Sequence, residues 1–408
     1  MSTTAADPTI SRVDPLAVAR ELATLIAAGS LEGEALGRLP DATAAALLDA
    51  RLFSVLLPPT LGGYGRGHAD LFDVIEEVSR ADASAGWCVS IGTTNNTGMG
   101  EGLPPAGLAE VFGEEGRVVA AGSLAPVAVS EPAEGGFLVS GRFSWASGSG
   151  HADWYVASSL TTTDEGGLGL RFHVLPMSDC EPVDTWHVAG LKATCSRDLV
   201  VESVLVPVHR CYEMAFGAET FADRYARSVQ DASVTGGERT SLRRGPSIEE
   251  STVVGVAGLA AWSSGVARRA LEELVALAPV AKRLLADGML ADDGRVRLRL
   301  AEVESPLLAL RAQLRAQLEE LDRHLAEGVE APESVRVAAM EAALGLTRSA
   351  REAVLFAFDV APAKAVYLDH PLQRCLRDLL TGLKHAAGSP AMFEKVGQAR
   401  LGIAGHGL

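Results

Sequence analysis

The spacing of hydrophobic residues divides the chain into a helical part, a β part and a second helical part. Residues 1–117 carry hydrophobic side chains three and four positions apart, as in Leu71, Val74, Ile75 and Val78. Residues 118–215 consist of short apolar runs such as FLVSGRFSW and LVVESVLVP, separated by glycine, proline and aspartate. Residues 251–408 return to helical spacing over four long stretches. The pattern predicts an N-terminal helical domain, a small β-barrel or sandwich, and a four-helix bundle.

A polar segment separates the β part from the bundle. Residues 216–250, which end in VTGGERTSLRRGPSIEE, show neither helical nor alternating periodicity. Long connections without secondary structure are uncommon in compact domains and are usually functional loops or linkers. We therefore predict a polar excursion or a mobile linker here.

The charge of the chain argues against two classes of partner. Its 408 residues include 36 Lys and Arg against 52 Asp and Glu, so the formal net charge is −16. An acidic surface repels phosphate backbones and anionic lipids, so we expect neither nucleic acid nor a membrane as a partner. The longest apolar uncharged stretch, residues 251–267, is short for a bilayer-spanning helix. Residues 1–14 lack the pattern of a secretory signal, and we expect a cytoplasmic protein.

Common metal and nucleotide motifs are missing from the sequence. The five cysteines are odd in number and widely spaced, so we expect reduced thiols rather than a disulfide framework. The nine histidines form no HExxH pattern, and we expect no metal site. There is also no GxxxxGK[ST] loop and no GxGxxG between a strand and a helix, which argues against a bound nucleoside triphosphate or nicotinamide.

Three segments carry a resemblance to a known family. They read GRFSWASGSGHADWYV at 141–156, GLKATCSRDLVVESVLVP at 190–207 and HPLQRCLRDLLTGLKH at 370–385. In this order, within a helix–strand–helix chain, they resemble the acyl-CoA dehydrogenase superfamily over about residues 16–402. The resemblance implies an α+β fold: an N-terminal helical domain, a central β-barrel domain and a C-terminal four-helix bundle, with a flavin between them. It also implies a homotetramer.

One branch of that superfamily matches better than the dehydrogenases. A dehydrogenase uses a carboxylate to remove the proton beside a thioester carbonyl, and the two usual positions of that carboxylate here read LLTGLKHAAGSP and TVVGVAGLAAW. Neither contains an acid, and Glu394 and Glu249 are displaced from them. The sequence more closely resembles two-component flavin monooxygenases. Their oxygenase component takes reduced FMN or FAD, diffusing from a separate reductase, and uses O2 through a C4a-hydroperoxide. The resemblance implies hydroxylation of a small molecule, either an aromatic or polyketide-like ring or an amine.

The resemblance points to three catalytic candidates. His385 lies where oxygenating relatives place a histidine beside the flavin, and an imidazole can take a substrate proton or hold a peroxide; alone it would equally suit a helix end. Ser147 matches a hydroxyl near the flavin N5 and C4a edge, and Ser149 is the rival candidate for that hydroxyl. The alternative for Ser147 is an ordinary serine of a Ser-Gly turn between strands. Asn95 falls on a helix where several relatives carry a histidine; as a neutral donor it would assist oxygen chemistry, and helix capping is its alternative.

Six further residues are candidates for binding the flavin. Ser123, in AAGSLAP, matches a flavin-contacting turn, and Trp87 falls on the helix that relatives turn toward the pocket. Trp145 either stacks beside the isoalloxazine ring or, alternating with Phe143, lies in the core. Cationic groups that would hold the flavin phosphate follow the first bundle helix and precede the last one, although surface solvation explains them equally well. These are Lys282, Arg283 and Lys364.

Two other functions stay open from the sequence. The first is an acyl-CoA dehydrogenase whose base has moved, which would carry tightly bound oxidised FAD. The second is a flavin-free assembly or binding module that keeps the same fold. Failure to bind reduced flavin in any form would favour the second.

Overall fold

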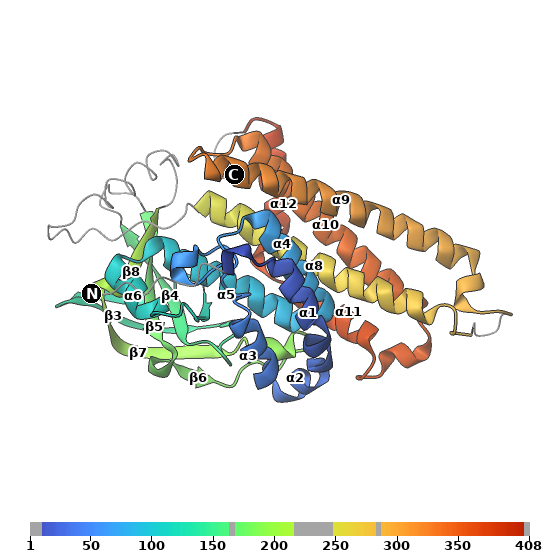
Figure 1. The fold of residues 1–408 in the computed structure, drawn as a ribbon, viewed down its shortest axis with the longest axis horizontal. Coiled ribbons are helices and arrows are strands. Elements are labelled where there is room, and N and C mark those ends of the chain that lie inside the picture. The colour runs from blue at the N-terminus through green and yellow to red at the C-terminus, as the bar shows by residue number, and fades with distance from the viewer. Residues whose placement is uncertain (1–9, 124, 163–167, 216–247, 283–286, 404–408) are drawn as a thin grey trace.

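The computed structural model describes residues 10–123, 125–162, 168–215, 248–282 and 287–403. Sheets lie at one end of the molecule and long helices at the other, with the N-terminal helices between them (Figure 1). The N-terminal helices are α1 (Pro15–Ala28), α2 (Ser30–Leu36), α3 (Asp41–Asp49), α4 (His68–Ala81), α5 (Ala83–Gly102) and α6 (Pro105–Phe112). Asp82 separates α4 from α5, and its carboxylate accepts the Ala85 N–H at 2.8 Å, which caps α5.

The β part forms two four-stranded sheets. One has the order β1-β4-β5-β8 and the other β2-β3-β7-β6. β1 pairs with β4 in parallel, and the remaining pairs are antiparallel. The strands are β1 (Ala120–Gly122), β2 (Val129–Ala133), β3 (Gly136–Phe143), β4 (Trp154–Thr162), β5 (Leu168–Pro176), β6 (Glu181–Val183), β7 (Asp198–Pro207) and β8 (Cys211–Ala215).

The two sheets pack face to face, so the expected β-barrel is not found. In the described residues they remain separate, and their edge strands do not pair to close a barrel. Side chains from both sheets, including Phe143, Tyr155 and Leu199, form the core between them. The other face of the β1-β4-β5-β8 sheet packs against α5 and α6 through a second core that includes Met99 and Phe172. The domain is a sandwich of two open sheets.

The C-terminal part is a bundle of helices. It contains α8 (Ile248–Leu277), α9 (Gly294–Ala326), α10 (Glu333–Val360), α11 (Pro371–Gly382) and α12 (Pro390–Arg400). α10 packs against α8, α9 and α11, and α11 also packs against α8. Figure 1 shows α8, α9 and α10 running side by side. The C-terminal helices pack together as a bundle, in which α11 is a short member. Most of the predicted 216–250 excursion lies outside the described residues.

α4 joins the N-terminal helices to the bundle. It packs against α1, α5, α8 and α9, and most of its residues are buried. The Glu76 carboxylate, 1% exposed, accepts hydrogen bonds of 2.7–2.9 Å from side chains of α8 and α9, namely Ser264, Arg268 and Arg311. A buried carboxylate paired in this way holds the N-terminal helices in fixed register on the bundle. In the described residues, no helix has the length and apolar character needed to cross a bilayer.

Candidate active site

Trp87 of α5 lies where the sandwich, the N-terminal helices and the bundle meet. Its Nε1–H donates to Ser147 Oγ at 3.1 Å. Its ring meets that of His385 edge to face, with centroids 5.6 Å apart and planes at 80°. On another side it meets Trp262 of α8 at 5.0 Å and 84°. The structure therefore brings together three of the residues selected from the sequence, Trp87, Ser147 and His385.

Ser147 is held by two loops that run side by side. It follows β3 in a tight turn in which Trp145 and Gly148 adopt positive φ values of 62° and 83°. The turn is tied to the loop before β7, because Ala146 N–H donates to the Arg197 carbonyl and Gly148 N–H to the Thr194 carbonyl. The Ser147 side chain is consequently buried and fixed in place.

A chain of buried hydroxyl groups continues inward from Ser147. Its Oγ lies 2.8 Å from Ser196 Oγ, which lies 2.6 Å from Thr194 Oγ1. Thr194 Oγ1 donates to the Leu191 carbonyl at 2.8 Å. Leu191 N–H in turn donates to the Asp378 carboxylate of α11 at 2.6 Å. Burial raises the pKa of Asp378 to about 7.

His385 follows α11 and caps the short 3-10 helix η8 (Ala386–Gly388). Its Nδ1 accepts the Ala387 N–H at 3.2 Å, so in the neutral imidazole the proton lies on Nε2. Part of the residue is exposed, yet desolvation by the surrounding atoms lowers the pKa of the imidazole. At neutral pH the side chain is therefore uncharged, with Nε2–H available to a ligand.

Trp145 does not lie in the core. The alternation with Phe143 ends at the strand, because the positive φ of Trp145 turns its side chain out of the sheet pattern. Phe143 is fully buried, whereas Trp145 is 69% exposed. The core interpretation is wrong, and an exposed indole lies two residues from Ser147. Its stacking on a flavin stays a prediction.

Asn95 and Ser123 form a separate group. Asn95 lies within α5, not at its end, and its Nδ2 donates to the Ala120 carbonyl of β1 at 3.3 Å, so the helix-cap interpretation is wrong. It lies about 12 Å along α5 from Trp87 and packs against Gly122. Ser123 Oγ accepts the Ala125 N–H at 3.3 Å, as an ordinary turn hydroxyl does. Neither residue touches the Trp87 cluster.

The two described lysines predicted to hold a phosphate lie away from this cluster. Lys282 is exposed and follows the end of α8, about 22 Å along the helix axis beyond Trp262. Lys364 is exposed in η7 (Ala363–Val366), which packs near the start of α11, whereas His385 follows its end. Arg283 lies outside the described residues.

Acidic side chains do not contact the Trp87 cluster in the part of the chain that the structure describes. Glu394 is exposed on α12, where it accepts from Gln398. Asp378 is fully buried and accepts from Leu191. The side chain of Glu249 lies outside the described residues. No described carboxylate is therefore placed to act as the base of a dehydrogenase.

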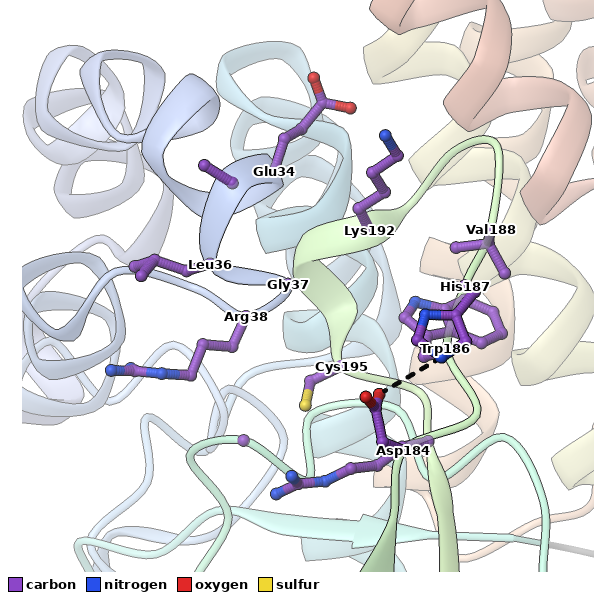
Figure 2. Close-up of a pocket in the computed structure, with 13 residues that line it drawn as sticks. Glu34, Leu36, Gly37, Arg38, Asp184, Trp186, His187, Val188, Lys192 and Cys195 are labelled. Atoms are coloured by element: carbon purple, nitrogen blue, oxygen red, sulfur yellow. Dashed lines mark ion pairs between the residues drawn. The ribbon is translucent and has the colours of Figure 1, made fainter.

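A cavity of about 700 Å³ adjoins the two loops that hold Ser147. Figure 2 shows Glu34 and Arg38 on one side of it, Asp184 and His187 on another, and Lys192 between them. His187 and Asp184 lie 3.8 Å apart as an ion pair. None of the residues selected from the sequence lines this cavity. Its charged walls suit a polar group rather than an apolar ring.

Three residues of the site were not predicted from the sequence: Thr194, Ser196 and Trp262. All three lie in segments that were singled out, since ATCS belongs to the second motif and TVVGVAGLAAW was searched for an acid. The signal for the first two was a pair of hydroxyl residues two positions apart beside a strand. Trp262 carried no signal except that a large aromatic residue ends a run of small ones.

Comparison with known proteins agrees with this architecture. Residues 257–390 match the family model of the acyl-CoA dehydrogenase C-terminal domain. The flavin-dependent monooxygenase oxygenase subunit HsaA of Mycobacterium tuberculosis (strain H37Rv) is 28% identical over 357 residues, 88% of this chain and 87% of that protein. The oxygenase component of the FADH2-dependent resorcinol hydroxylase of Rhizobium sp. is 33% identical over 190 residues, 46% of each chain.

Solved structures extend the similarity to the whole fold. The crystal structure of the HsaA monooxygenase from M. tuberculosis superposes with a TM-score of 0.81 and 26% identity, over 97% of this chain and 99% of that chain. The resemblance read from the three sequence motifs is confirmed. The chain is thus similar to flavin-dependent monooxygenases over most of its length, and its C-terminal helices match the acyl-CoA dehydrogenase C-terminal domain.

Proposed function

We propose that the chain is the oxygenase component of a two-component flavin-dependent monooxygenase. It takes reduced FMN or FAD, which diffuses from a separate reductase in the cytoplasm, and hydroxylates a small aromatic or polyketide-like ring or an amine. The observation that carries this proposal is the cluster in which Trp87, Ser147 and His385 meet without a described carboxylate. A dehydrogenase with a relocated base would need an acid there.

The chemistry of the cluster fits a reduced flavin. Trp87 and His385 supply aromatic surface, and the exposed Trp145 indole supplies a further flat face beside Ser147. Ser147 Oγ supplies a polar atom at the buried side of this surface. When bound, reduced flavin supplies the two electrons with which O2 is split between the hydroxylated product and water. The chain's own task is to hold the ring and to keep water away from it.

His385 positions the substrate by donating a hydrogen bond. Its Nδ1 is occupied by the Ala387 N–H, so Nε2 carries the proton and meets a substrate oxygen or nitrogen as a donor. Because Nε2 already carries a proton, a second proton would have to go to Nδ1, which would give an imidazolium whose Nδ1–H faces the Ala387 N–H. The hydrogen bond that caps η8 would then be lost. The lowered pKa of His385 also favours the donor role, because it keeps the ring neutral at pH 7 with the proton on Nε2.

The bundle surface supports a homotetramer. Apolar side chains that a monomer would leave in water occur in two segments, one after α10 and one near the C-terminal end of the described chain: Val366, Tyr367, Leu368, Leu401 and Ile403. Leu298 and Leu308 of α9 are also exposed. Exposed apolar side chains of this size are typical of protein interfaces when they adjoin one another. Light scattering should give four times the mass of the chain.

The proposal is tested by supplying reduced flavin and oxygen. The purified chain, a flavin reductase, NADH and FMN or FAD are mixed with phenols, indoles and aromatic amines, and hydroxylated product is measured per O2 consumed. Ser149→Ala is the matched control, because Ser149 is a buried serine of the same loop whose Oγ donates to the Cys195 carbonyl. We expect hydroxylated product with the wild type and with Ser149→Ala. With Ser147→Ala we expect hydrogen peroxide in place of product. A chain that binds neither reduced FMN nor reduced FAD would overturn the proposal.

A further inference from the structure

We infer that the cavity beside the loops of Ser147 is a second binding site, which takes a small hydroxylated organic anion. The phosphate or carboxylate group of this anion lies between Lys192 and Arg197. The cavity measures about 700 Å³, and pockets of this size hold a whole small molecule. Nothing in the inference requires a flavin, so it goes beyond the proposed function and is tested apart from it.

Two cationic side chains of the cavity wall have no acidic partner among the described residues. Lys192 begins the short 3-10 helix η4 (Lys192–Thr194), and Arg197 comes directly before β7. Arg197 Nε is buried and meets no hydrogen-bond acceptor in the part of the chain that the structure describes. A buried donor without an acceptor costs free energy, and a buried charge is normally paired. An anion in the cavity would supply the acceptor that Arg197 lacks.

The acidic side chains of the wall are already paired with other residues. Glu34 accepts two hydrogen bonds from the Arg377 guanidinium of α11, at 2.8 and 3.1 Å. Asp184 faces His187 at 3.8 Å. The lysine and the arginine of the wall therefore carry positive charge that its carboxylates do not neutralise, in a chain whose net charge is −16. A local excess of positive charge of this kind attracts an anion.

The segment from Lys192 to Arg197 separates this cavity from the active-site cluster. Ser196 directs its hydroxyl group to the buried side, where its Oγ lies 2.8 Å from Ser147 Oγ. Its two neighbours, Cys195 and Arg197, line the cavity instead. Figure 2 shows Cys195 and Lys192 on this wall of the cavity. The cavity and the cluster thus lie on different sides of one segment, and a ligand in the cavity need not occupy the place proposed for the flavin.

The chemistry of the wall favours an oxyanion group on a hydroxylated body. A guanidinium binds a phosphate or a carboxylate through two parallel N–H groups, and an ammonium adds a point charge. The carboxylates of Glu34 and Asp184 keep lone pairs that can accept from hydroxyl groups of the same ligand. Because ionisable side chains make up much of the wall, an apolar body would leave them without partners. Sugar phosphates and sugar acids combine both kinds of group.

The test measures the binding of three probes to the whole chain by titration calorimetry. Glucose 6-phosphate carries a phosphate and gluconate a carboxylate, so the tighter of the two identifies the group that the site takes. Inorganic phosphate lacks the hydroxylated body and should bind more weakly. Arg197→Gln should raise the Kd of the tighter probe about tenfold or more, because it removes a hydrogen bond between charged groups. Arg142→Gln is the matched control and should leave that Kd unchanged, since Arg142 lies on β3 outside the cavity wall and pairs with Asp198 at 2.8 Å.

A second variant and a competition experiment make the result decisive. If Arg197→Gln fails to fold, Lys192→Gln tests the same point from the other end of the segment. The inference is overturned if no probe binds the wild type, if the variant binds as tightly as the wild type, or if inorganic phosphate binds as tightly as the organic anions. Reduced FMN, loaded anaerobically, should leave the Kd of the probe unchanged. Displacement of the probe by FMN would place the cavity within the flavin site and would also overturn the inference, although the proposed function would survive each of these results.

Discussion

Two substitutions of His385 distinguish its structural role as the cap of η8 from its proposed role as a hydrogen-bond donor to the substrate. His385→Asn keeps an acceptor at the start of η8, because an asparagine side chain can accept the N–H two residues on, as Nδ1 does now from Ala387. His385→Ala keeps no acceptor. Both variants lose Nε2–H and the edge contact with Trp87. The pair of variants thus differs by one hydrogen bond and shares the loss of the donor.

The magnitudes follow from these contacts. An edge-to-face aromatic pair contributes about 1 kcal/mol, and a neutral hydrogen bond contributes about 1 kcal/mol. The free energy of unfolding should fall by about 1 kcal/mol in His385→Asn and by about 2 kcal/mol in His385→Ala. Loss of a donor to the substrate should lower kcat/KM about tenfold in both variants.

Urea unfolding and product yield per O2 measure the two effects separately. Equal unfolding midpoints for the two variants would refute the role of His385 as a cap. Full product yield in both would refute its role toward the substrate, whatever happens to stability. Ser149→Ala serves again as the control that retains all His385 contacts.

The lowered pKa of His385 adds a pH dependence with a definite sign. The folded state favours the neutral ring, so the unfolded chain binds more protons just below the ordinary histidine pKa of about 6.5. This contribution to stability is fully present above that pH and is lost as the pH falls through the folded pKa. Product yield should be level from about pH 7 upward and fall in acid. His385→Asn should lack both trends.

Four further changes test other parts of the structure. Glu76→Ala removes the buried carboxylate that Ser264, Arg268 and Arg311 share, although Arg311 keeps Asp73 and Arg268 keeps Glu77, and should cost about 3 kcal/mol in urea unfolding; an unchanged midpoint would contradict this. Because the pKa of Asp378 is raised from 3.8 to about 7, wild-type stability should fall by up to about 4 kcal/mol as the pH rises through this window. Asp378→Asn should lose that slope in unfolding measured at several pH values. Gly382→Ala puts a methyl group into the Trp262 ring, so tryptophan fluorescence should change and product yield should drop. Trp145→Ala should leave stability within about 0.5 kcal/mol because the indole is exposed, yet weaken the binding of reduced flavin in a titration.

The order of helices and strands could be predicted from the sequence, whereas the closure of the sheets could not. Alternating burial on β3 and β7 is the same in a sandwich and in a barrel, since both bury one face of each strand. Closure depends on whether edge strands such as β2 and β6 find partners, and hydrophobic spacing carries no information on that. The likeness to a known family suggested a barrel, and the described sheets are open.

Residues of the site could be predicted only where they lie in segments that resemble a known family. Trp87, Ser147 and His385 lie far apart in the sequence, and periodicity does not say that they touch; the resemblance did. For Trp145 the sequence left both stacking on the flavin and a place in the core open, because side-chain pattern does not report the single positive φ that ends the alternation. Lys282 lies far from the cluster because α8 extends well beyond Trp262, so a short interval in sequence becomes a long distance in space.

The central claim is that the Trp87, Ser147 and His385 cluster holds reduced flavin while it reacts with oxygen. Its most direct test is to mix the chain and reduced FMN or FAD, anaerobically loaded, with oxygenated buffer and to follow oxidised flavin and hydrogen peroxide over time. With wild type, both should appear more slowly than from free flavin, and Ser147→Ala should remove the delay while Ser149→Ala keeps it. Identical time courses with and without the wild-type chain would contradict the claim.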